Sequence, residues 1–402
     1  MLKNNSYIFK PCVIGLGYVG LPILLNLSKK FKSIGYDISN KRILELNRGI
    51  DIFKEIKKND LKNKSLKFHS NINKIKKCNI FIVTVPTPIY DNKKPDLSHL
   101  HNVCAKLSKI IKQNDVIIFE STVYPGLTSE YCIPLLEKNN TFKEGLDFFV
   151  GYSPERVNPG DNRHGLKKID KILAYPHFYR KKELLSLYSL ISKKIIFTKS
   201  IREAETAKLI ENIQRDVNIG LINEIYLFCK KLDINFDNVI DLASTKWNFL
   251  KFKPGLVGGH CLPVDPYYFS FISKKNKFKT RITLAGRYIN DSMEEIIRQK
   301  IKTDLKSIDP KRNKKILICG LSYKKDVADL RNSLSLKIFN SLKYKNIKGY
   351  DPLIETNSAK KSGLVTSKKE FLNFDIYIIL TKHSILEKQI KNLKNKIIIK
   401  PI

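Results

Sequence analysis

The sequence predicts an α/β protein with two Rossmann-like, doubly wound domains joined by a long central helix. A strand, a glycine-rich loop and a helix follow one another near the N-terminus, and a second strand–glycine–loop unit begins at residue 314. Between these two units, Glu203–Lys231 contains no proline and carries apolar residues at helical spacing. A chain of 402 residues is also too long for one ordinary core. We therefore expect domains at residues 1–200, 201–300 and 301–402.

The N-terminal unit has the features of a dinucleotide-binding site. Residues 8–14 are expected to form a strand, Gly15–Gly20 has the sequence GLGYVG, and the next strand, Ser33–Tyr36, ends at Asp37. The glycines allow a tight turn and a close approach to a pyrophosphate, and the acid can accept a hydrogen bond from a ribose 2′-OH. Because a carboxylate repels a 2′-phosphate, the sequence favours NAD over NADP. Pro11 should shorten or distort the first strand.

Polar residues follow two further apolar runs, at residues 80–85 and 115–119, which we expect to be buried parallel strands. Thr87 follows the first run and Thr122 follows the second. Ligands bind beyond the carboxyl ends of such strands, so both threonines can contact the cofactor or a reacting group. Either threonine can also cap the helix that follows it.

One more expected strand, at residues 148–151, precedes Tyr152–Asp161, which has the sequence YSPERVNPGD. Glu155 and Arg156 stand there between two prolines. Adjacent opposite charges between prolines are usually a solvated turn. Because these charges fall at the carboxyl edge of the expected sheet, a role in a site stays open beside that interpretation.

The most unusual loop is Gly255–Tyr268, with the sequence GLVGGHCLPVDPYY. Its glycines and prolines exclude a regular helix or a central strand. Cys261 stands four residues before Asp265 and directly after His260. A thiolate is a strong nucleophile, and a nearby carboxylate or imidazole can manage its proton or activate water. Taken alone, the loop also fits a buried structural cysteine beside a turn-forming aspartate.

The central helix should bury one face and connect two domains, and its length also suggests a subunit contact. Lys208, Asn212 and Arg215 form a polar stripe on another face. Such a stripe is normally solvated, and only its neighbours could make it catalytic. The predicted apolar face consists of Ala204, Ala207, Ile210, Ile213, Val217, Leu221 and Ile225.

The C-terminal third predicts a second α/β domain without a GxGxxG motif. After a helix at residues 285–300, strands are expected at residues 314–319, 347–350 and 375–380. Lys324 and Arg331 lie in the loop after the first of these strands, where they could hold an anionic ligand between domains. They fit a solvated basic loop equally well.

The composition is that of a soluble globular protein with excess positive charge. Apolar residues make up 42% and charged residues 28%, and the formal net charge is +36. The excess is mostly Lys spread along the chain, so we attribute it to compositional drift and to attraction of an anionic substrate. Seven cysteines without a CxxC pair favour a reducing compartment. Without a convincing targeting segment or apolar span, we expect a cytoplasmic protein.

A series of ordered motifs covers nearly the whole chain and resembles the UDP-glucose/GDP-mannose dehydrogenase family. Three segments look most like the UDP-N-acetylglucosamine/galactosamine 6-dehydrogenases of capsule, O-antigen and Vi-antigen synthesis: residues 152–161, 211–224 and 245–250. The family motifs are GLGYVGLP (15–22), VPTP (85–88), STVYPG (121–126), SPER (153–156), AKLIEN (207–212), GGHC with its later Asp (258–265) and GLSYKKDVADLR (320–331).

The resemblance implies catalytic roles. Cys261 resembles the nucleophile that holds the C6 aldehyde as a thiohemiacetal and then a thioester. Lys208 and Asn212 resemble the pair that stabilises negative charge on the C6 oxygen. Asp265, with Thr122, resembles the group that positions the hydrolytic water or handles protons. Glu155 stands where the family has a carboxylate near the same chemistry.

The resemblance also implies binding roles, a homodimer and no metal. Lys253 stands where relatives usually have Arg, which would weaken a bidentate phosphate contact. Cofactor contacts are expected from Gly15, Gly17, Tyr18, Val19, Gly20, Asp37, Arg42, Thr87, Thr122 and Arg331. Substrate contacts are expected from Glu155, Arg156, Lys208, Asn212, Lys253, Gly258 and Lys324.

We therefore expect an NAD-dependent enzyme that oxidises C6 of a UDP-N-acetylhexosamine, UDP-GlcNAc or UDP-GalNAc, to the uronic acid for surface polysaccharide synthesis. One alternative is UDP-glucose as substrate. A second is a degenerate, non-catalytic nucleotide-sugar binding protein, which an assay of NADH production would exclude. A third is polyanion binding driven by the net charge, which would show strongly salt-dependent affinity for nucleic acid. Nucleic acid and membrane are not expected partners.

Overall fold

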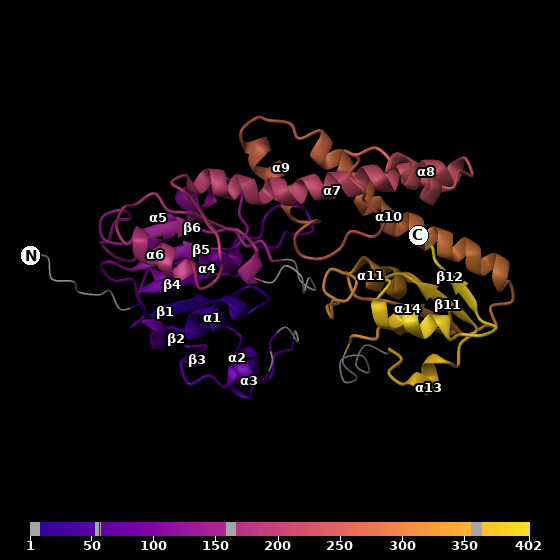
Figure 1. The fold of residues 1–402 in the computed structure, drawn as a ribbon, viewed down its shortest axis with the longest axis horizontal. Helices are drawn as coiled ribbons and strands as arrows, with labels where there is room; N and C mark the ends of the chain where they lie inside the picture. Colours follow the sequence, from indigo (N-terminus) through magenta and orange to yellow (C-terminus); the bar gives the residue numbers. More distant parts are fainter. Residues whose placement is uncertain (1–8, 53–55, 57, 158–165, 355–363) are drawn as a thin grey trace, which may run out of the picture. The chain divides into compact units, whose positions relative to one another are not determined.

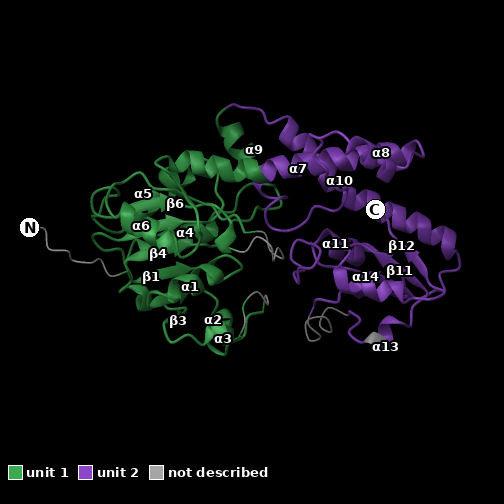
Figure 2. Ribbon diagram, viewed as in Figure 1, with its two compact units in different colours: residues 1–211, 267–276 green, residues 212–266, 277–402 purple. Residues whose placement is uncertain are grey.

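The computed structural model describes residues 9–52, 56, 58–157, 166–354 and 364–402. The chain forms two compact units (Figure 2). Unit 1 is Met1–Glu211 with Tyr267–Asn276, and unit 2 is Asn212–Pro266 with Lys277–Ile402. Helix α7 (Ile201–Lys231) continues from one unit into the other (Figure 1). This arrangement confirms the predicted fold class of two α/β domains joined by a long central helix.

Within the described residues, unit 1 is built on an eight-stranded sheet with the order β3-β2-β1-β4-β5-β6-β7-β8. Strands β1 to β6 are parallel, β7 is antiparallel to β6, and β8 is parallel to β7. The strands are β1 (Pro11–Ile14), β2 (Ser33–Tyr36), β3 (Leu66–His69), β4 (Ile80–Val83), β5 (Val116–Phe119), β6 (Phe149–Tyr152), β7 (Lys171–Ala174) and β8 (Ile195–Thr198).

The central strands of this sheet are buried on both faces. Val13, Ile82 and Ile118 are in register on neighbouring strands and belong to one apolar cluster. Their sequence neighbours, which point to the opposite face, are equally buried, which explains why these strands are continuous apolar runs. Besides the first part of α7 and most of α9 (Asp265–Lys275), the described helices of unit 1 are α1 (Gly20–Ser28), α2 (Asn40–Asn47), α3 (Lys58–Leu61), α4 (Ser98–Leu107), α5 (Ile133–Glu137) and α6 (Lys181–Tyr188), with 3₁₀ turns at Ile72–Ile75 and Leu166–Lys168 and a π-helical turn at Thr128–Cys132.

Pro11 shortens β1 as predicted. The strand begins at Pro11, and the two residues before it, Phe9 and Lys10, are not in a strand; residue 8, the start of the predicted strand, lies outside the described residues. Pro11 is the first strand residue, a position where its missing N–H does least harm even though β1 pairs with β2 and β4. Strands β3, β7 and β8 were not expected from the sequence. Each is only four residues long; β3 (LKFH) and β7 (KILA) contain a lysine, and β8 (IIFT) is only partly buried.

Unit 2 contains a smaller parallel sheet with the order β10-β9-β11-β12. Ile316 and Ile318 face one apolar cluster, and Leu317 and Cys319 face another, so both faces of β9 are covered. This confirms the second α/β domain. Its elements are α8 (Phe236–Ala243), α10 (Ile282–Ile308), β9 (Ile316–Cys319), α11 (Leu334–Ser341), β10 (Ile347–Tyr350), α13 (Lys368–Phe371), β11 (Ile376–Ile379), α14 (Ser384–Lys391) and β12 (Ile397–Ile399).

The loop predicted over Gly255–Tyr268 ends earlier than expected. Helix α9 (Asp265–Lys275) begins at Asp265, with Pro266 in its first turn, where a missing N–H costs nothing. The prediction of irregular structure was therefore wrong for Asp265–Tyr268. Helix α10 is longer than predicted at both ends.

The predicted apolar face of α7 is partly wrong. Ile210 and Leu221 are each 55% exposed, whereas Lys208 and Asn212 are buried. The solvated-stripe interpretation holds only for Arg215. Burial of polar residues on this helix is possible because neighbouring groups hydrogen-bond or pair with them. Among the helices of the described chain, none is long and apolar enough to cross a membrane.

Helices α7 and α10 touch each other through glycines. A Cβ atom on Gly220 would lie 2.7 Å from the carbonyl oxygen and 2.9 Å from the Cα of Gly286. A Cβ on Gly286 would lie 3.0 Å from the Cα of Val217. Two helix backbones therefore meet directly, and a side chain at either glycine would force them apart.

We expect Gly220→Val to lower the free energy of unfolding by about 1–3 kcal/mol, as overpacked cores do. The added atoms meet backbone, which cannot rotate away as a side chain can. Thermal unfolding followed by circular dichroism measures this loss. Glu224→Val, at an exposed position of the same helix, is the matched control. Equal melting temperatures for the two variants would contradict the close contact.

Candidate active site

The glycine loop after β1 fits a dinucleotide phosphate. Gly15 has φ +92°, a left-handed conformation that favours glycine. A Cβ on Gly20 would lie 1.9 Å from the Gly15 carbonyl oxygen, whereas one on Gly17 would meet nothing within 4 Å. Backbone there is open to close approach by a pyrophosphate at the start of α1. Tyr18 and Val19 complete the turn into that helix.

Asp37 and Arg42 both hold this loop. The Asp37 carboxylate accepts hydrogen bonds from the backbone N–H groups of Leu16 and Ser39, each at 2.9 Å. The Arg42 Nε donates to the Leu16 carbonyl (3.0 Å), and its Nη2 pairs with Asp51 (2.8 Å). The carboxylate is half-buried at the end of β2, where it retains acceptor capacity for a ribose hydroxyl.

Thr84 was missed by the sequence analysis. Its hydroxyl donates to the Gly15 carbonyl at 2.7 Å and fixes the glycine loop to the end of β4. Thr87 and Thr122 are half-buried in the loops after β4 and β5. The loop that carries Thr122 is held by Ser121, which donates to the Val85 carbonyl at 2.7 Å.

Glu155 belongs to a buried charged triad that the sequence did not reveal. Lys171, on β7, donates to Glu120 and, at 3.1 Å, to Glu155. Glu120 also accepts a hydrogen bond from the Tyr188 hydroxyl at 2.8 Å. The other Glu155 oxygen accepts from the N–H groups of Arg156 (2.8 Å) and Val157 (2.5 Å). The solvated-turn interpretation of Glu155 is therefore wrong.

One cation lies between two carboxylates in this triad, so only one of them is fully balanced. Burial alone would raise the pKa of Glu155. The charge of Lys171, the hydrogen bond from the Val157 N–H and, to a smaller extent, the charge of Lys208 outweigh burial, so the pKa of Glu155 is lowered. Burial raises the pKa of Glu120 to about 7 against the attraction of Lys171. The pKa of Lys171 is itself raised, since its two carboxylates outweigh burial. Glu155 is therefore the ionised partner, and Glu120 gains or loses a proton near neutral pH.

Two more predicted residues of unit 1 lie close to this triad. Arg156 donates to the Asp170 carbonyl (3.0 Å) and pairs with Glu211 of α7 (2.5 Å). Lys208, buried on the same helix, is near enough to lower the pKa of Glu155. Asn212, one turn beyond Lys208, is the first residue of unit 2.

The thiol loop of unit 2, residues 255–264, places Cys261 one turn before Asp265. The Cys261 carbonyl accepts from the N–H groups of Val264 (3.0 Å) and Asp265 (2.9 Å), so the cysteine precedes the first turn of α9. The buried Asp265 carboxylate accepts from the Asn212 side-chain amide at 2.6 Å. Cys261 is exposed, whereas the other six of the seven cysteines are buried. The interpretation as a buried structural cysteine is therefore wrong.

The thiol loop packs on the loop that follows β9. The Gly259 N–H donates to the Asn332 carbonyl at 3.1 Å, and a Cβ on Gly258 would lie 2.7 Å from that same oxygen. His260 pairs with Asp329 at 3.3 Å. Arg331 binds Asp329 through two nitrogens, at 3.0 and 2.7 Å.

Hydrogen bonds from His260 and Arg331 outweigh burial and hold the pKa of Asp329 well below its usual range. A carboxylate that stays ionised keeps both of these partners in place. The motifs GGHC and GLSYKKDVADLR are thus in contact. Lys324 is half-buried in the second motif, and Lys253 is exposed before the first.

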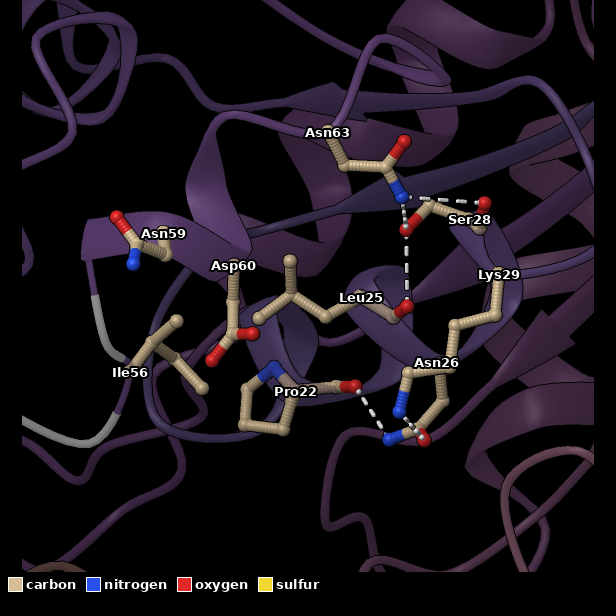
Figure 3. A pocket seen from close by; sticks show the side chains of 9 residues that line it. All are labelled: Pro22, Leu25, Asn26, Ser28, Lys29, Ile56, Asn59, Asp60 and Asn63. Carbon is tan, nitrogen blue, oxygen red and sulfur yellow. Dashed lines mark hydrogen bonds between the residues drawn. The ribbon is translucent and has the colours of Figure 1, made fainter.

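One hollow lies beside α1 and α3 in unit 1 (Figure 3). Its volume is about 320 Å³. Asn63 on its rim donates to the Ser28 carbonyl and hydroxyl at 3.3 and 3.2 Å, so its polar wall is internally bonded. None of the predicted site residues lines it.

Three sequence families match consecutive parts of the chain. They are the NAD binding domain (residues 9–216), the central domain (residues 202–292) and the UDP binding domain (residues 317–402) of UDP-glucose/GDP-mannose dehydrogenases. The chain belongs to the UDP-glucose/GDP-mannose dehydrogenase family. It is therefore an NAD-dependent dehydrogenase that acts on a UDP-sugar, and the predictions of family, enzyme class and cofactor are confirmed.

Individual relatives of this dehydrogenase are similar over most of their length. UDP-N-acetyl-D-glucosamine 6-dehydrogenase of Pseudomonas aeruginosa is 42% identical over 87% of this chain and 84% of its own. The protein of the same name from Salmonella typhi is 39% identical over 93% and 90%. The solved structure of UDP-D-ManNAc dehydrogenase from Pyrococcus horikoshii has a TM-score of 0.84 and 32% identity and covers 97% of this chain and 94% of that one.

Part of the predicted site lies outside the described residues. Asn158–Asp161, the end of the YSPERVNPGD motif, belongs to that part. The residues missed by sequence reasoning are Thr84, Glu120 and Lys171. An acid directly after an apolar strand was a usable signal for Glu120. No sequence signal pointed to Lys171, because lysines are so frequent along this chain that no single one stands out.

We expect Glu120→Gln to change how stability depends on pH. A carboxyl whose pKa is raised from 4.5 to about 7 by folding contributes stability that is present below pH 4.5 and lost as pH rises through about 7. The melting temperature of the variant should therefore fall less than that of the parent protein over this window. Differential scanning calorimetry at several pH values measures the difference.

Glu203→Gln, at an exposed carboxyl of α7, is the control and should follow the parent protein. Parallel pH profiles for Glu120→Gln and the parent protein would show that Glu120 does not titrate in this range.

Proposed function

We propose that this dehydrogenase oxidises the C6 hydroxyl of a UDP-N-acetylhexosamine to the uronic acid in two steps, through a covalent intermediate on Cys261. The observation that carries the proposal is the single exposed cysteine placed one turn before a buried carboxylate, Asp265, which is bonded to Asn212. An exposed thiol beside a positioned acid is suited to nucleophilic attack and proton transfer.

When bound, NAD would accept the hydride of the first oxidation, and a second NAD, exchanged for the NADH, would accept that of the second. In the first, the C6 hydroxyl loses a hydride from carbon and a proton from oxygen and becomes an aldehyde. The Cys261 sulfur then adds to C6, a C–S bond forms, and the oxygen takes a proton to give a thiohemiacetal. Loss of the second hydride and of that proton gives a thioester. Water attacks the thioester, the C–S bond breaks, and the acid and the free thiol are released.

The remaining residues handle charge and protons. Lys208 and Asn212, one turn apart on α7, would stabilise the negative charge that develops on the C6 oxygen. Asp265 and Thr122 would position the water, and Glu155 would accept a proton in its ionised form. Asp37 and the glycine loop would hold NAD. Lys253, Gly258 and Lys324 would bind the UDP-sugar together with Arg156, and Arg331 would contact the cofactor.

The N-acetylhexosamine assignment is supported by two relatives. The Pseudomonas aeruginosa and Salmonella typhi proteins, named for UDP-N-acetyl-D-glucosamine, are 42% and 39% identical to this chain. Protein CapL of Staphylococcus aureus is 41% identical over 92% of this chain. A role of the uronic acid in surface polysaccharide synthesis is part of our proposal and comes from the resemblance of the motifs. The proposal includes both epimers, UDP-GlcNAc and UDP-GalNAc, and UDP-glucose is the alternative substrate.

We propose functional domains at residues 1–200, 201–300 and 301–402.

We further propose a homodimer formed through unit 2. Leu221 and Phe228, seven residues apart, share one face of α7, and Leu232 directly follows the helix; all three are more than half exposed. Trp247, after α8, is 93% exposed, and Tyr288 of α10 is 73% exposed. Large exposed apolar side chains on α7 and α10 and in the residues after α7 and α8 support a protein–protein interface.

Cys261→Ala should retain the fold and NAD binding but lose uronate formation. Cys261→Ser should be severely impaired as well, because a hydroxyl is a far poorer nucleophile near neutral pH. Product analysis by mass spectrometry and NADH absorbance measure the result, with two NADH per sugar and no free aldehyde expected from the parent protein. Uronate made by Cys261→Ala at the parent rate would exclude the covalent mechanism, and a parent protein that makes no NADH would favour the non-catalytic alternative.

UDP-GlcNAc or UDP-GalNAc should give a higher kcat/KM than UDP-glucose. This preference is expected because three segments, at residues 152–161, 211–224 and 245–250, resemble enzymes whose sugar carries an N-acetyl group at C2. Initial rates of NADH formation with the three UDP-sugars measure the preference. A clear preference for UDP-glucose would make this chain a UDP-glucose 6-dehydrogenase.

Phe228→Glu should convert a dimer to a monomer, since a charge in an apolar interface must be desolvated. Light scattering coupled to size-exclusion chromatography gives the mass. Phe178→Glu, at an exposed aromatic residue of unit 1, is the control and should leave the mass unchanged. A parent protein with the mass of one chain would refute the dimer.

A further inference from the structure

Four buried polar residues form a chain of contacts in unit 2 beside the thiol loop. Asp216 and Asn223 lie on α7, Arg287 and Asn290 lie on α10, and each is fully buried. Arg287 pairs with Asp216 at 2.5 Å. The Asn290 amide donates to the same Asp216 oxygen at 2.9 Å and to the Asp216 carbonyl at 2.8 Å. Asn223 donates to the Asn290 side-chain oxygen at 2.8 Å.

Both ends of this series of four side chains bind the loop that carries Cys261. At one end, Asn223 accepts from the Gly255 N–H (2.8 Å) and donates to the Gly255 carbonyl (3.1 Å). At the other end, Arg287 donates to the Leu262 carbonyl at 3.4 Å. The loop is therefore held before the thiol and directly after it by groups on two packed helices.

Stability alone does not account for these contacts. A buried ion pair is often no better than apolar residues of the same volume, because both charges lose their hydration. Here Asp216 Oδ2 and Arg287 Nε are buried and make no hydrogen bond within the described residues, so the desolvation is incompletely offset. Burial accordingly raises the pKa of Asp216 to about 6 in spite of Arg287. The ion pair instead fixes the orientation of the Arg287 side chain, because a planar guanidinium held by one acceptor presents its other N–H groups to further acceptors in the same plane.

We propose that Arg287 and Asn223 are positioning residues that fix the backbone of the thiol loop at both ends and so set the place of Cys261. The proposal rests on the proposed function only where it concerns the reaction. A loop held at Gly255 and Leu262 presents its sulfur in one position. The aldehyde is then captured before it leaves, and a displacement of about 1 Å can cost on the order of 10²-fold in rate.

Two variants and a control test this role. Arg287→Lys keeps the charge opposite Asp216 but loses the planar fork that also reaches Asp291 (3.2 Å) and Leu262. Asn223→Ser removes the paired bonds to Gly255. Ile301→Ala leaves a cavity on the same helix, α10, without touching the loop, and controls for lost stability.

The first readout is independent of catalysis. Hydrogen exchange, followed by mass spectrometry, should become faster at residues 255–264 in both variants and stay unchanged there in Ile301→Ala. Alkylation of the native proteins checks the fold, because only one of the seven thiols is exposed. If Arg287→Lys exposes further thiols and is misfolded, Asn223→Ser alone decides the outcome. Unchanged exchange at residues 255–264 in a folded variant would overturn the proposal.

The second readout is the reaction itself. We expect kcat to fall on the order of 10²-fold in both variants with little change in the KM for the UDP-sugar, and trapped aldehyde to appear in the product. A loss no larger than that of Ile301→Ala, without aldehyde, would also overturn the proposal. Failure of the covalent mechanism is distinct, because it would show as uronate formation by Cys261→Ala and would leave the exchange result standing.

Discussion

The burial of charged and amide side chains along α7 is the constraint on which the rest of the structure depends. A polar group removed from water must find a partner, and on α7 each partner belongs to a different part of the chain. Glu205 accepts from the Gly126 and Thr128 N–H groups of the loop after β5, at 2.6 and 3.0 Å. Asn212 binds Asp265, and Asp216 binds Arg287. Within unit 1, α7 thereby holds the loop after β5, and within unit 2 it holds the start of α9 and α10.

This arrangement explains why the helical pattern misled the sequence analysis. Apolar spacing predicted that Ile210 and Leu221 would face the core, yet both are exposed. Hydrophobic periodicity assumes that a helix buries apolar residues and solvates polar ones. On α7 buried apolar residues such as Leu209 and Ile222 lie among buried polar ones, which specific partners stabilise, and Ile210 and Leu221 are left exposed. Patterns record residue type, whereas burial depends on partners far away in the sequence.

Other parts could be predicted because their information is local. The tight turn at Gly15–Gly20 and the acid after β2 depend on the backbone of a few consecutive residues. The loop around Cys261 was recognised from its composition, although its end was misplaced because Asp265 and Pro266 are also good helix starters. The triad of Glu120, Lys171 and Glu155 could not be predicted. It joins residues from three strand ends, and one of them lies beyond an antiparallel step in the sheet.

The same glycine turn follows β1 in the first sheet and β9 in the second, but the aspartates that bind these two turns differ in their other contacts. Gly320, with φ +77°, donates to the Tyr350 carbonyl at 2.9 Å, as Gly15 does to Tyr36 at 2.8 Å. Asp351 then accepts from the Leu321 N–H at 2.8 Å, as Asp37 does from Leu16.

The second carboxylate is buried, however, and the same oxygen also accepts from the Ser322 N–H and hydroxyl and pairs with His383. Its other oxygen accepts from the Leu353 N–H at 3.0 Å. A buried acid whose two oxygens are both engaged in this way is not available to bind a ribose hydroxyl. The duplicated turn therefore supports a dinucleotide in only one of its two copies, and each chain should take up one NAD at a time.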